Sequence, residues 1–173
     1  LQLPLSDCGA VALDYRGEKG IATALGHAPQ AALANPAAGS VLAVAEALTN
    51  LVWAPLAIED EKGASAMDSI SLSANWMWPC RAQEGEDARL YSAVKALSDF
   101  CCALQINVPT GKDSLSMTQK YPNGDKVVSP GTVIVSAAFP PLSNNSTNEP
   151  SGAPTIFNNN VPYSSSFFTF TVC

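Results

Sequence analysis

Two oxygen-bearing side chains, Glu46 and Asn50, are four residues apart in the segment AEALTN. At this spacing two side chains share one face of an α-helix. A carboxylate and an amide carbonyl are both hard oxygen ligands, of the kind that Mg²⁺ prefers. The pair therefore indicates a candidate magnesium site, and the alternative interpretation is an ordinary solvated helix face.

A third oxygen ligand could come from Asp7, in the run Ser6-Asp7-Cys8. This run precedes an alternating stretch that predicts a strand, so the carboxylate would lie where a strand begins. The alternative is an aspartate that caps a turn. The pattern alone leaves both interpretations open.

A phosphate could be bound by the segment Gly111-Lys112-Asp113-Ser114, within PTGKDSLSM. At a junction between a loop and a strand, such a segment offers backbone N–H groups, the Lys112 cation and the Ser114 hydroxyl. The spacing of a Walker A loop is absent. An ordinary turn is the alternative.

The elements that must position these residues follow from periodicity and breakers. We expect a helix over 40–53 with Ser40 as its N-cap, and a second helix over 86–104. Strands are expected over 9–15, 21–25, 69–78, 115–121, 126–129 and 132–138, with a loop over 107–112 and a hairpin turn at Asn123-Gly124. Mixed strands with two main helices predict an α+β fold with a mixed sheet.

Both helices carry an apolar stripe that predicts their buried face. On the first helix the stripe comprises Val41, Val44, Ala45, Leu48 and Val52, and on the second it comprises Leu90, Val94, Leu97 and Cys101. Trp76 and Trp78 are expected to be buried strand residues. Asn75, which precedes Trp76 in this apolar run, needs a hydrogen-bond partner, so we expect either a structural tie or a contact with substrate.

Composition excludes several classes of function. The 173 residues carry a net charge of −6 and contain no basic block, which argues against nucleic acid or an anionic membrane as partner. The five cysteines are odd in number and form no C-x-x-C pair, so they predict neither a disulfide framework nor a zinc site. A reducing, cytoplasmic compartment is the simpler expectation. Charged residues make up only 14%, which suggests surfaces that other protein covers.

The character of the chain changes near its C-terminal end. Residues 140–173 contain a single charge, Glu149, and are crowded with Ser, Asn, Thr and Pro. We therefore expect one domain over 1–138 and a divergent, disordered tail over 139–173.

Several segments taken in order resemble one enzyme family, the large single-chain phosphoribosylformylglycinamidine synthases. They are PLSDCGAVALDYRGEKGIATALGHAP at 4–29, NPAAGSVLAVAEALTNLVWAPLA at 35–57, SISLSANWMWPC at 69–80, GEDARLYSAVKALSDF at 85–100, PTGKDSLSMTQKY at 109–121 and SPGTVIVSA at 129–137. The likeness covers about four fifths of the chain. It looks like the N-terminal part of the second of two aminoimidazole ribonucleotide synthetase-like repeats.

The resemblance implies an ATP-dependent ligase of purine biosynthesis, which converts formylglycinamide ribonucleotide, glutamine and ATP to the amidine. It implies an auxiliary ADP or ATP site with Mg²⁺, in which Asp7, Glu46 and Asn50 are metal ligands and Ser6 touches the nucleotide. Gly111, Lys112 and Ser114 resemble part of the family's substrate loop. The implied partners are the rest of the same synthase, namely the sister repeat and a separate glutaminase domain, so none of the cysteines here is expected to be the glutaminase nucleophile.

Two other hypotheses remain. The chain could be a purely structural half-repeat, in which the same ligands hold a permanent cofactor for rigidity. It could also belong to another ATP-dependent synthetase or kinase of the same superfamily, although the SANWMW and GKDSLSM runs favour the synthase.

Overall fold

The computed structural model describes residues 8–13, 15, 19–52, 54, 66–80 and 82–143. Two longer helices, one short helix and seven strands make up this part of the chain, with a single 3-10 turn. In order they are β1 (Cys8–Ala12), β2 (Lys19–His27), α1 (Pro29–Ala34), α2 (Pro36–Leu51), the turn η1 (Ala66–Ser69), β3 (Ser71–Met77), α3 (Glu86–Leu104), β4 (Asn107–Ser114), β5 (Thr118–Lys120), β6 (Lys126–Val128) and β7 (Thr132–Ser143). The expected α+β class is confirmed.

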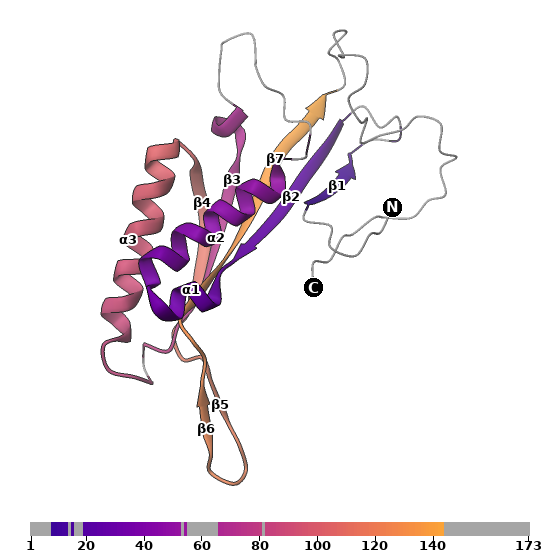
Figure 1. The fold of residues 1–173 in the computed structure, drawn as a ribbon. Coiled ribbons are helices and arrows are strands. Elements are labelled where there is room, and N and C mark those ends of the chain that lie inside the picture. The colour runs from indigo at the N-terminus through magenta and orange to yellow at the C-terminus, as the bar shows by residue number, and fades with distance from the viewer. Residues whose placement is uncertain are drawn as a thin grey trace.

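Five strands form one mixed sheet in the order β1-β2-β7-β3-β4. Its neighbours are antiparallel except β3 and β4, which are parallel and are joined through α3. Strands β5 and β6 form a separate antiparallel hairpin that projects beyond one end of the sheet (Figure 1).

The three helices cover one face of this sheet (Figure 1). Strand β3 shows the consequence most clearly, because Leu72, Ala74 and Trp76 are buried whereas the alternate side chains are only half-buried. Successive side chains of a strand point to opposite faces, so β3 presents its apolar residues to the helices. The opposite face carries Ser, Thr and Asn side chains and is called the open face below.

Helix α2 begins at a cap that differs from the expected one. Asn35 is the N-cap, and its Oδ1 accepts a hydrogen bond from the Ala38 N–H at 3.1 Å. Ser40 lies inside the helix, is buried, and donates to the Pro36 carbonyl at 2.7 Å. The prediction of Ser40 as N-cap was wrong because Pro36 fits the first helical position and lets the helix start four residues earlier.

The apolar stripes were only partly predicted. On α2 the buried residues are Gly39, Ser40, Ala43, Val44, Ala47 and Leu51, whereas Val52 is 61% exposed. The small residues Ala43 and Ala47 stand in this buried line where β2 approaches the helix closely at Gly26. On α3, Leu97 and Cys101 are buried as predicted, but Val94 is exposed.

The predicted bounds of the remaining helices and strands are partly confirmed. Helix α3 has the predicted bounds, both tryptophans at 76 and 78 are buried, and the hairpin about Asn123-Gly124 forms. The expected loop over 107–112 is strand β4 instead, and strand β7 continues past Ala138 to Ser143, where it still pairs with β2. The tail expected to be disordered over 139–173 therefore begins with five residues, 139–143, that belong to β7, and the rest of it lies outside the described residues.

No helix within the described ranges is long and apolar enough to span a membrane.

Candidate functional site

The candidate site is built where helix α2 crosses the end of strand β2. The crossing is close: a Cβ added at Gly26 would lie 1.9 Å from the Ala43 carbonyl oxygen and 2.5 Å from the Ala47 nitrogen. Real Cβ atoms do not approach backbone at such distances, so only glycine allows this contact. Gly26 and the two alanines therefore fix how α2 sits on the sheet.

Glu46 and Asn50 straddle this crossing and bind the strand backbone on either side of Gly26. The Glu46 Oε2 accepts a hydrogen bond from the His27 N–H at 2.6 Å. The Asn50 Nδ2 donates to the Leu25 carbonyl at 2.9 Å. The two side chains predicted from their i, i+4 spacing thus lie on one helix face, and these two hydrogen bonds fix their positions against β2.

Each of the two side chains keeps one oxygen uncommitted. Among the described residues, neither the Glu46 Oε1 nor the Asn50 Oδ1 has a hydrogen-bond partner. A carboxylate oxygen and an amide oxygen are suitable ligands for Mg²⁺. The arrangement therefore fits a hard cation, with the two remaining oxygens available to it.

The N-terminal strand meets β2 next to this point. Cys8, the first residue of β1, is in register with Ala24, and Leu25 is the residue whose carbonyl Asn50 binds. Ser6 and Asp7, the expected nucleotide contact and third metal ligand, lie outside the described residues. Within the described part of the chain, no group of three His, Cys, Asp or Glu side chains could hold a metal ion.

The segment from Gly111 to Ser114 lies inside strand β4 rather than in a loop. The expectation of a loop with converging backbone N–H groups was therefore wrong, because the parallel pairing of β4 with β3 extends through Ser114. Lys112 is exposed and its Nζ donates to the Ser114 Oγ at 3.0 Å. Two residues apart on a strand, these side chains share one face.

Gly111 has a structural reason to be glycine. A Cβ at this position would lie 2.7 Å from the carbonyl oxygen of Ala74 on the neighbouring strand. The residue allows β4 to lie close to β3, which places Lys112 beside Asn75 in register.

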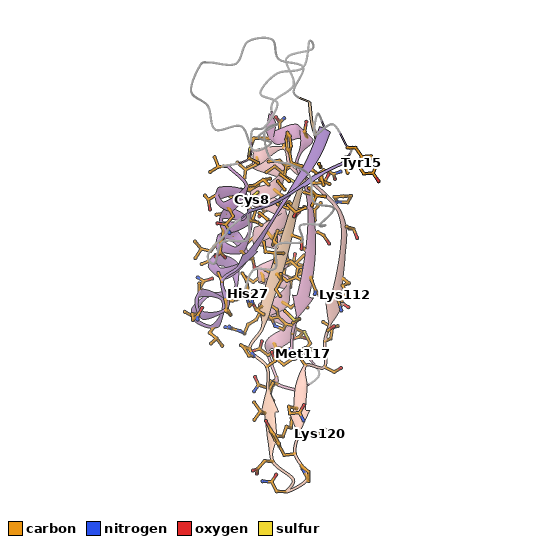
Figure 2. All side chains as sticks on the ribbon, turned by 90° about the vertical axis from the view of Figure 1, so that its right-hand side faces the viewer. Cys8, Tyr15, His27, Lys112, Met117 and Lys120 are labelled. Atoms are coloured by element: carbon orange, nitrogen blue, oxygen red, sulfur yellow. The ribbon has the colours of Figure 1, made fainter. Side chains whose placement is uncertain are left out.

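The two candidate regions lie at the same end of the sheet but are well separated. His27, Ile134, Asn75 and Lys112 form one row of register partners across β2, β7, β3 and β4. Three strand spacings separate His27 from Lys112, or about 14 Å. Figure 2 shows these two residues at one level, His27 at the left and Lys112 at the right. A single small ion cannot contact both regions.

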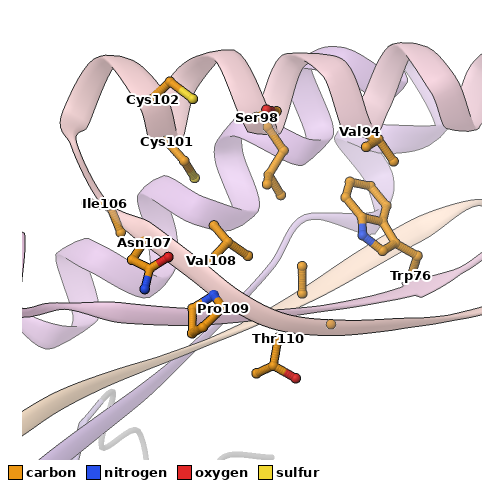
Figure 3. Close-up of a pocket in the computed structure, with 13 residues that line it drawn as sticks. Trp76, Val94, Ser98, Cys101, Cys102, Ile106, Asn107, Val108, Pro109 and Thr110 are labelled. Atoms are coloured by element: carbon orange, nitrogen blue, oxygen red, sulfur yellow. The ribbon is translucent and has the colours of Figure 1, made fainter.

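A hollow in the described part of the molecule lies elsewhere. It has a volume of about 500 Å³ and is formed between α3 and β4. Trp76 and Cys101 extend into it from opposite sides (Figure 3). No charged side chain lines it, so it does not suit the phosphates of a nucleotide.

The thiols are poorly suited to nucleophilic chemistry. Burial raises the pKa of the Cys101 thiol. Burial, reinforced by the negative charge of Asp87, likewise raises the pKa of Cys80. A nucleophilic cysteine needs a lowered pKa, so the structure gives neither of these thiols the properties of a catalytic one.

Sequence reasoning missed two residues that bear on the site. Gly26 fixes the helix position, and the signal for it was the small pair Ala43 and Ala47 one turn apart on α2. Thr132 is only 5% exposed, and none of the described residues forms a hydrogen bond with its Oγ1. No pattern in the sequence distinguishes Thr132 from any other strand threonine.

Comparison with known proteins gives one consistent result. The family model for the FGAR-AT PurM_N-like domain matches residues 1–140. The phosphoribosylformylglycinamidine synthase of Drosophila melanogaster is 38% identical over 140 residues, which are 81% of this chain and 10% of that protein. The human phosphoribosylformylglycinamidine synthase is 40% identical over 137 residues, 79% of this chain and 10% of its own. The chain thus spans about a tenth of the curated relatives it matches.

Solved structures share the fold. PurL of Thermotoga maritima complexed with ADP has a TM-score of 0.55 at 18% identity, covering 80% of this chain and 20% of that one. The same protein complexed with FGAR also has a TM-score of 0.55 at 18% identity, covering 80% and 19%. Together with the match over residues 1–140, this likeness shows that the chain belongs to the FGAR-AT PurM_N-like domain family.

Proposed function

We propose that this chain is a segment of an ATP-dependent amidotransferase that converts formylglycinamide ribonucleotide, glutamine and ATP to formylglycinamidine ribonucleotide. The support is the family membership, with relatives named phosphoribosylformylglycinamidine synthase. Solved structures of PurL, which share this fold, are complexed with ADP, ATP and FGAR. The rest of such an enzyme, including a sister repeat and a glutaminase domain, would be the partner of this segment.

Within that enzyme the segment supplies a Mg²⁺–nucleotide site at the crossing of α2 and β2. The observation that carries this proposal is the pair of uncommitted oxygens, Glu46 Oε1 and Asn50 Oδ1, on side chains that bind the backbone of β2 on either side of Gly26. Asp7 would be the third ligand, since it is bonded directly to Cys8, whose register partner Ala24 adjoins Leu25. Ser6 would contact the nucleotide. When bound, Mg²⁺ would neutralise phosphate charge, while the protein residues orient it.

Gly111, Lys112 and Ser114 serve substrate binding in this proposal. Lys112 offers an exposed ammonium group that Ser114 already orients. Because Lys112 lies about 14 Å across the sheet from His27, whose N–H Glu46 binds, this region would contact a different ligand or a different part of one.

A structural role for Glu46 and Asn50 is the second candidate, and a specific observation favours it. Both side chains tie α2 to the backbone of β2, and such ties alone stabilise a fold. The two candidates differ in whether the charge of Glu46 is needed, because a glutamine at this position could still accept the His27 N–H.

A thermal melt of the complete synthase with and without Mg²⁺ plus ADP tests this choice. The proposal expects Mg²⁺ plus ADP to raise the melting temperature. Glu46→Gln is then expected to abolish the shift while leaving the ligand-free melting temperature unchanged. Thr49→Ala is the matched control on the same helix, because the Thr49 hydroxyl donates only to the Glu46 backbone carbonyl. A normal shift in Glu46→Gln contradicts metal binding, and a lowered ligand-free melting temperature favours the structural role.

A further inference from the structure

The open face of the sheet contains two buried polar atoms that nothing in the described structure satisfies. They are the Oδ1 of Asn75 on β3 and the Oγ1 of Thr132 on β7. Buried polar atoms without a partner are few in native proteins, because each one loses its hydrogen bonds to water and gains none in exchange. Two of them on one face of one sheet therefore point to a missing partner.

Asn75 adjoins the lysine proposed above to bind substrate, and Thr132 lies on the same face two strands away from that lysine. Asn75 is the register partner of Lys112 on the parallel neighbour β4. Met77, two residues after Asn75, is in register with Thr132 on one side and Ser114 on the other. Directly paired residues point to the same face of a sheet. Asn75, Lys112, Ser114 and Thr132 therefore form one polar cluster, which lies where the parallel strands β3 and β4 end.

The sequence required Asn75 to be either a structural tie or a ligand contact. The structure provides no tie, because the carbonyl oxygen of this side chain has no hydrogen-bond partner in the described part of the chain. A contact with a ligand is the alternative that remains. The carbonyl oxygen accepts a hydrogen bond, so the ligand must present an N–H or O–H donor there.

The neighbouring groups define what else the ligand carries. Lys112 provides a cation with two ammonium hydrogens beyond the one donated to Ser114, and a lysine ammonium is a common partner of phosphate. Register partners have Cβ atoms about 5 Å apart. The ligand must therefore place an anionic group and a hydroxyl or N–H donor at that separation, as a phosphorylated sugar does.

We infer that Asn75 is a further substrate-binding residue, which accepts a hydrogen bond from a sugar hydroxyl while Lys112 holds the adjacent phosphate. Ser114 orients Lys112, and the Thr132 hydroxyl takes a second position on the same sugar phosphate. This inference rests on the proposed function, because it assigns the ribose phosphate of the ribonucleotide substrate to this cluster.

The test is steady-state kinetics of the complete synthase with Asn75→Leu, which keeps the side-chain size and removes the acceptor. The KM for formylglycinamide ribonucleotide is expected to rise about tenfold, the equivalent of one lost hydrogen bond. The inhibition constant of ribose 5-phosphate should rise in parallel. The kcat and the KM values for ATP and glutamine should stay within about twofold, as expected for a residue that contributes uniform binding.

Ser73→Ala is the matched control, since Ser73 lies on the same strand and face two residues before Asn75 and pairs with Thr110 rather than Lys112. Its kinetic constants should equal those of the unchanged enzyme. Thr132→Val should also raise the KM for the ribonucleotide, but by less than Asn75→Leu does.

An unchanged KM for the ribonucleotide in Asn75→Leu overturns the inference. A lowered melting temperature with all KM values altered together overturns it as well. The melting shift caused by Mg²⁺ plus ADP, which Glu46→Gln tests, depends on a different site. Its result can therefore be distinguished from the result of the kinetic test of Asn75.

Discussion

The crossing of α2 and β2 and the edge strand β4 both carry candidate site residues, yet they are built in opposite ways. At the crossing, the backbones of helix and strand touch at Gly26, and two side chains add hydrogen bonds on either side. At β4, the pattern of exposure is almost continuous, and Lys112 reaches only Ser114 on its own strand.

This difference concerns what holds a functional group in place. The oxygens of Glu46 and Asn50 are positioned by the packing of the fold itself, so changes in packing should move them. Lys112 and Asn75 are positioned by strand register, and Lys112 also by its hydrogen bond to Ser114, so changes there should affect binding more than stability. Each prediction below tests one side of this contrast.

The largest effect is expected for Gly26→Ala. The added methyl group would meet the backbone of Ala43 and Ala47, which cannot move without displacing α2, so we expect a loss of about 3 kcal/mol or more. Gly111→Ala is the comparison at β4, where the single close atom is the Ala74 carbonyl oxygen at 2.7 Å, and its loss should be smaller. Denaturant unfolding measures both, and equal losses would remove the contrast between the two regions.

Arg89→Ala should give the next largest effect, again on the helix-covered side. The Arg89 Nη2 donates to the carbonyls of Ala32 and Leu33 at 3.1 and 3.0 Å, at the C-terminal end of α1. Hydrogen bonds from a charged donor contribute about 1.5–3 kcal/mol to stability, and a cation near the C-terminal end of a helix is stabilising. Arg89→Lys keeps the charge but not the fork of donors, so it should recover part of the loss in the same melt. No loss in Arg89→Ala would show that α1 is held by packing alone.

Asn35→Ala should cost less, because it removes one cap. The Asn35 side chain accepts the Ala38 N–H at the start of α2, and loss of such a cap costs about 1 kcal/mol. Asn35→Asp retains the acceptor and adds a charge that the helix N-terminus favours, so its unfolding midpoint should equal or exceed that of the unchanged chain. A drop in both variants would point to packing of the residue rather than to capping.

The same contrast explains how much the sequence predicted. Local signals identified α3 with its bounds, the hairpin about Asn123-Gly124 and the pairing of Glu46 with Asn50 on one helix face. These features depend on periods and turn residues within a short stretch. The strand character of 107–112 was missed, because it depends on pairing with β3, which lies some forty residues earlier in the chain.

Tertiary contact also set what local patterns could not. The buried line of α2 includes Ala43 and Ala47, because the strand backbone at Gly26 leaves no room for larger residues at these two positions. The unsatisfied oxygen of Asn75 could be recognised only once its neighbours were known. The sequence posed the choice between a tie and a contact at this residue, and the described part of the chain offers its side-chain oxygen no tie.

The smallest effect is expected on the projecting hairpin, where register alone operates and no helix packs. Lys120 and Lys126 are directly opposite on β5 and β6, and like charges in such pairs are destabilising. Lys126→Glu replaces the repulsion by attraction and should stabilise the hairpin by a few tenths of a kilocalorie per mole.

Added salt should shrink this gain in stability, since exposed charges are screened. Hydrogen exchange of the hairpin amides measures it, and a gain that persists at 1 M NaCl would assign the effect to strand propensity instead of charge. Because this arm lies beyond the main sheet (Figure 1), the change should leave the melting of the five-stranded sheet unaltered, which separates local register from the packing that holds the α2 crossing.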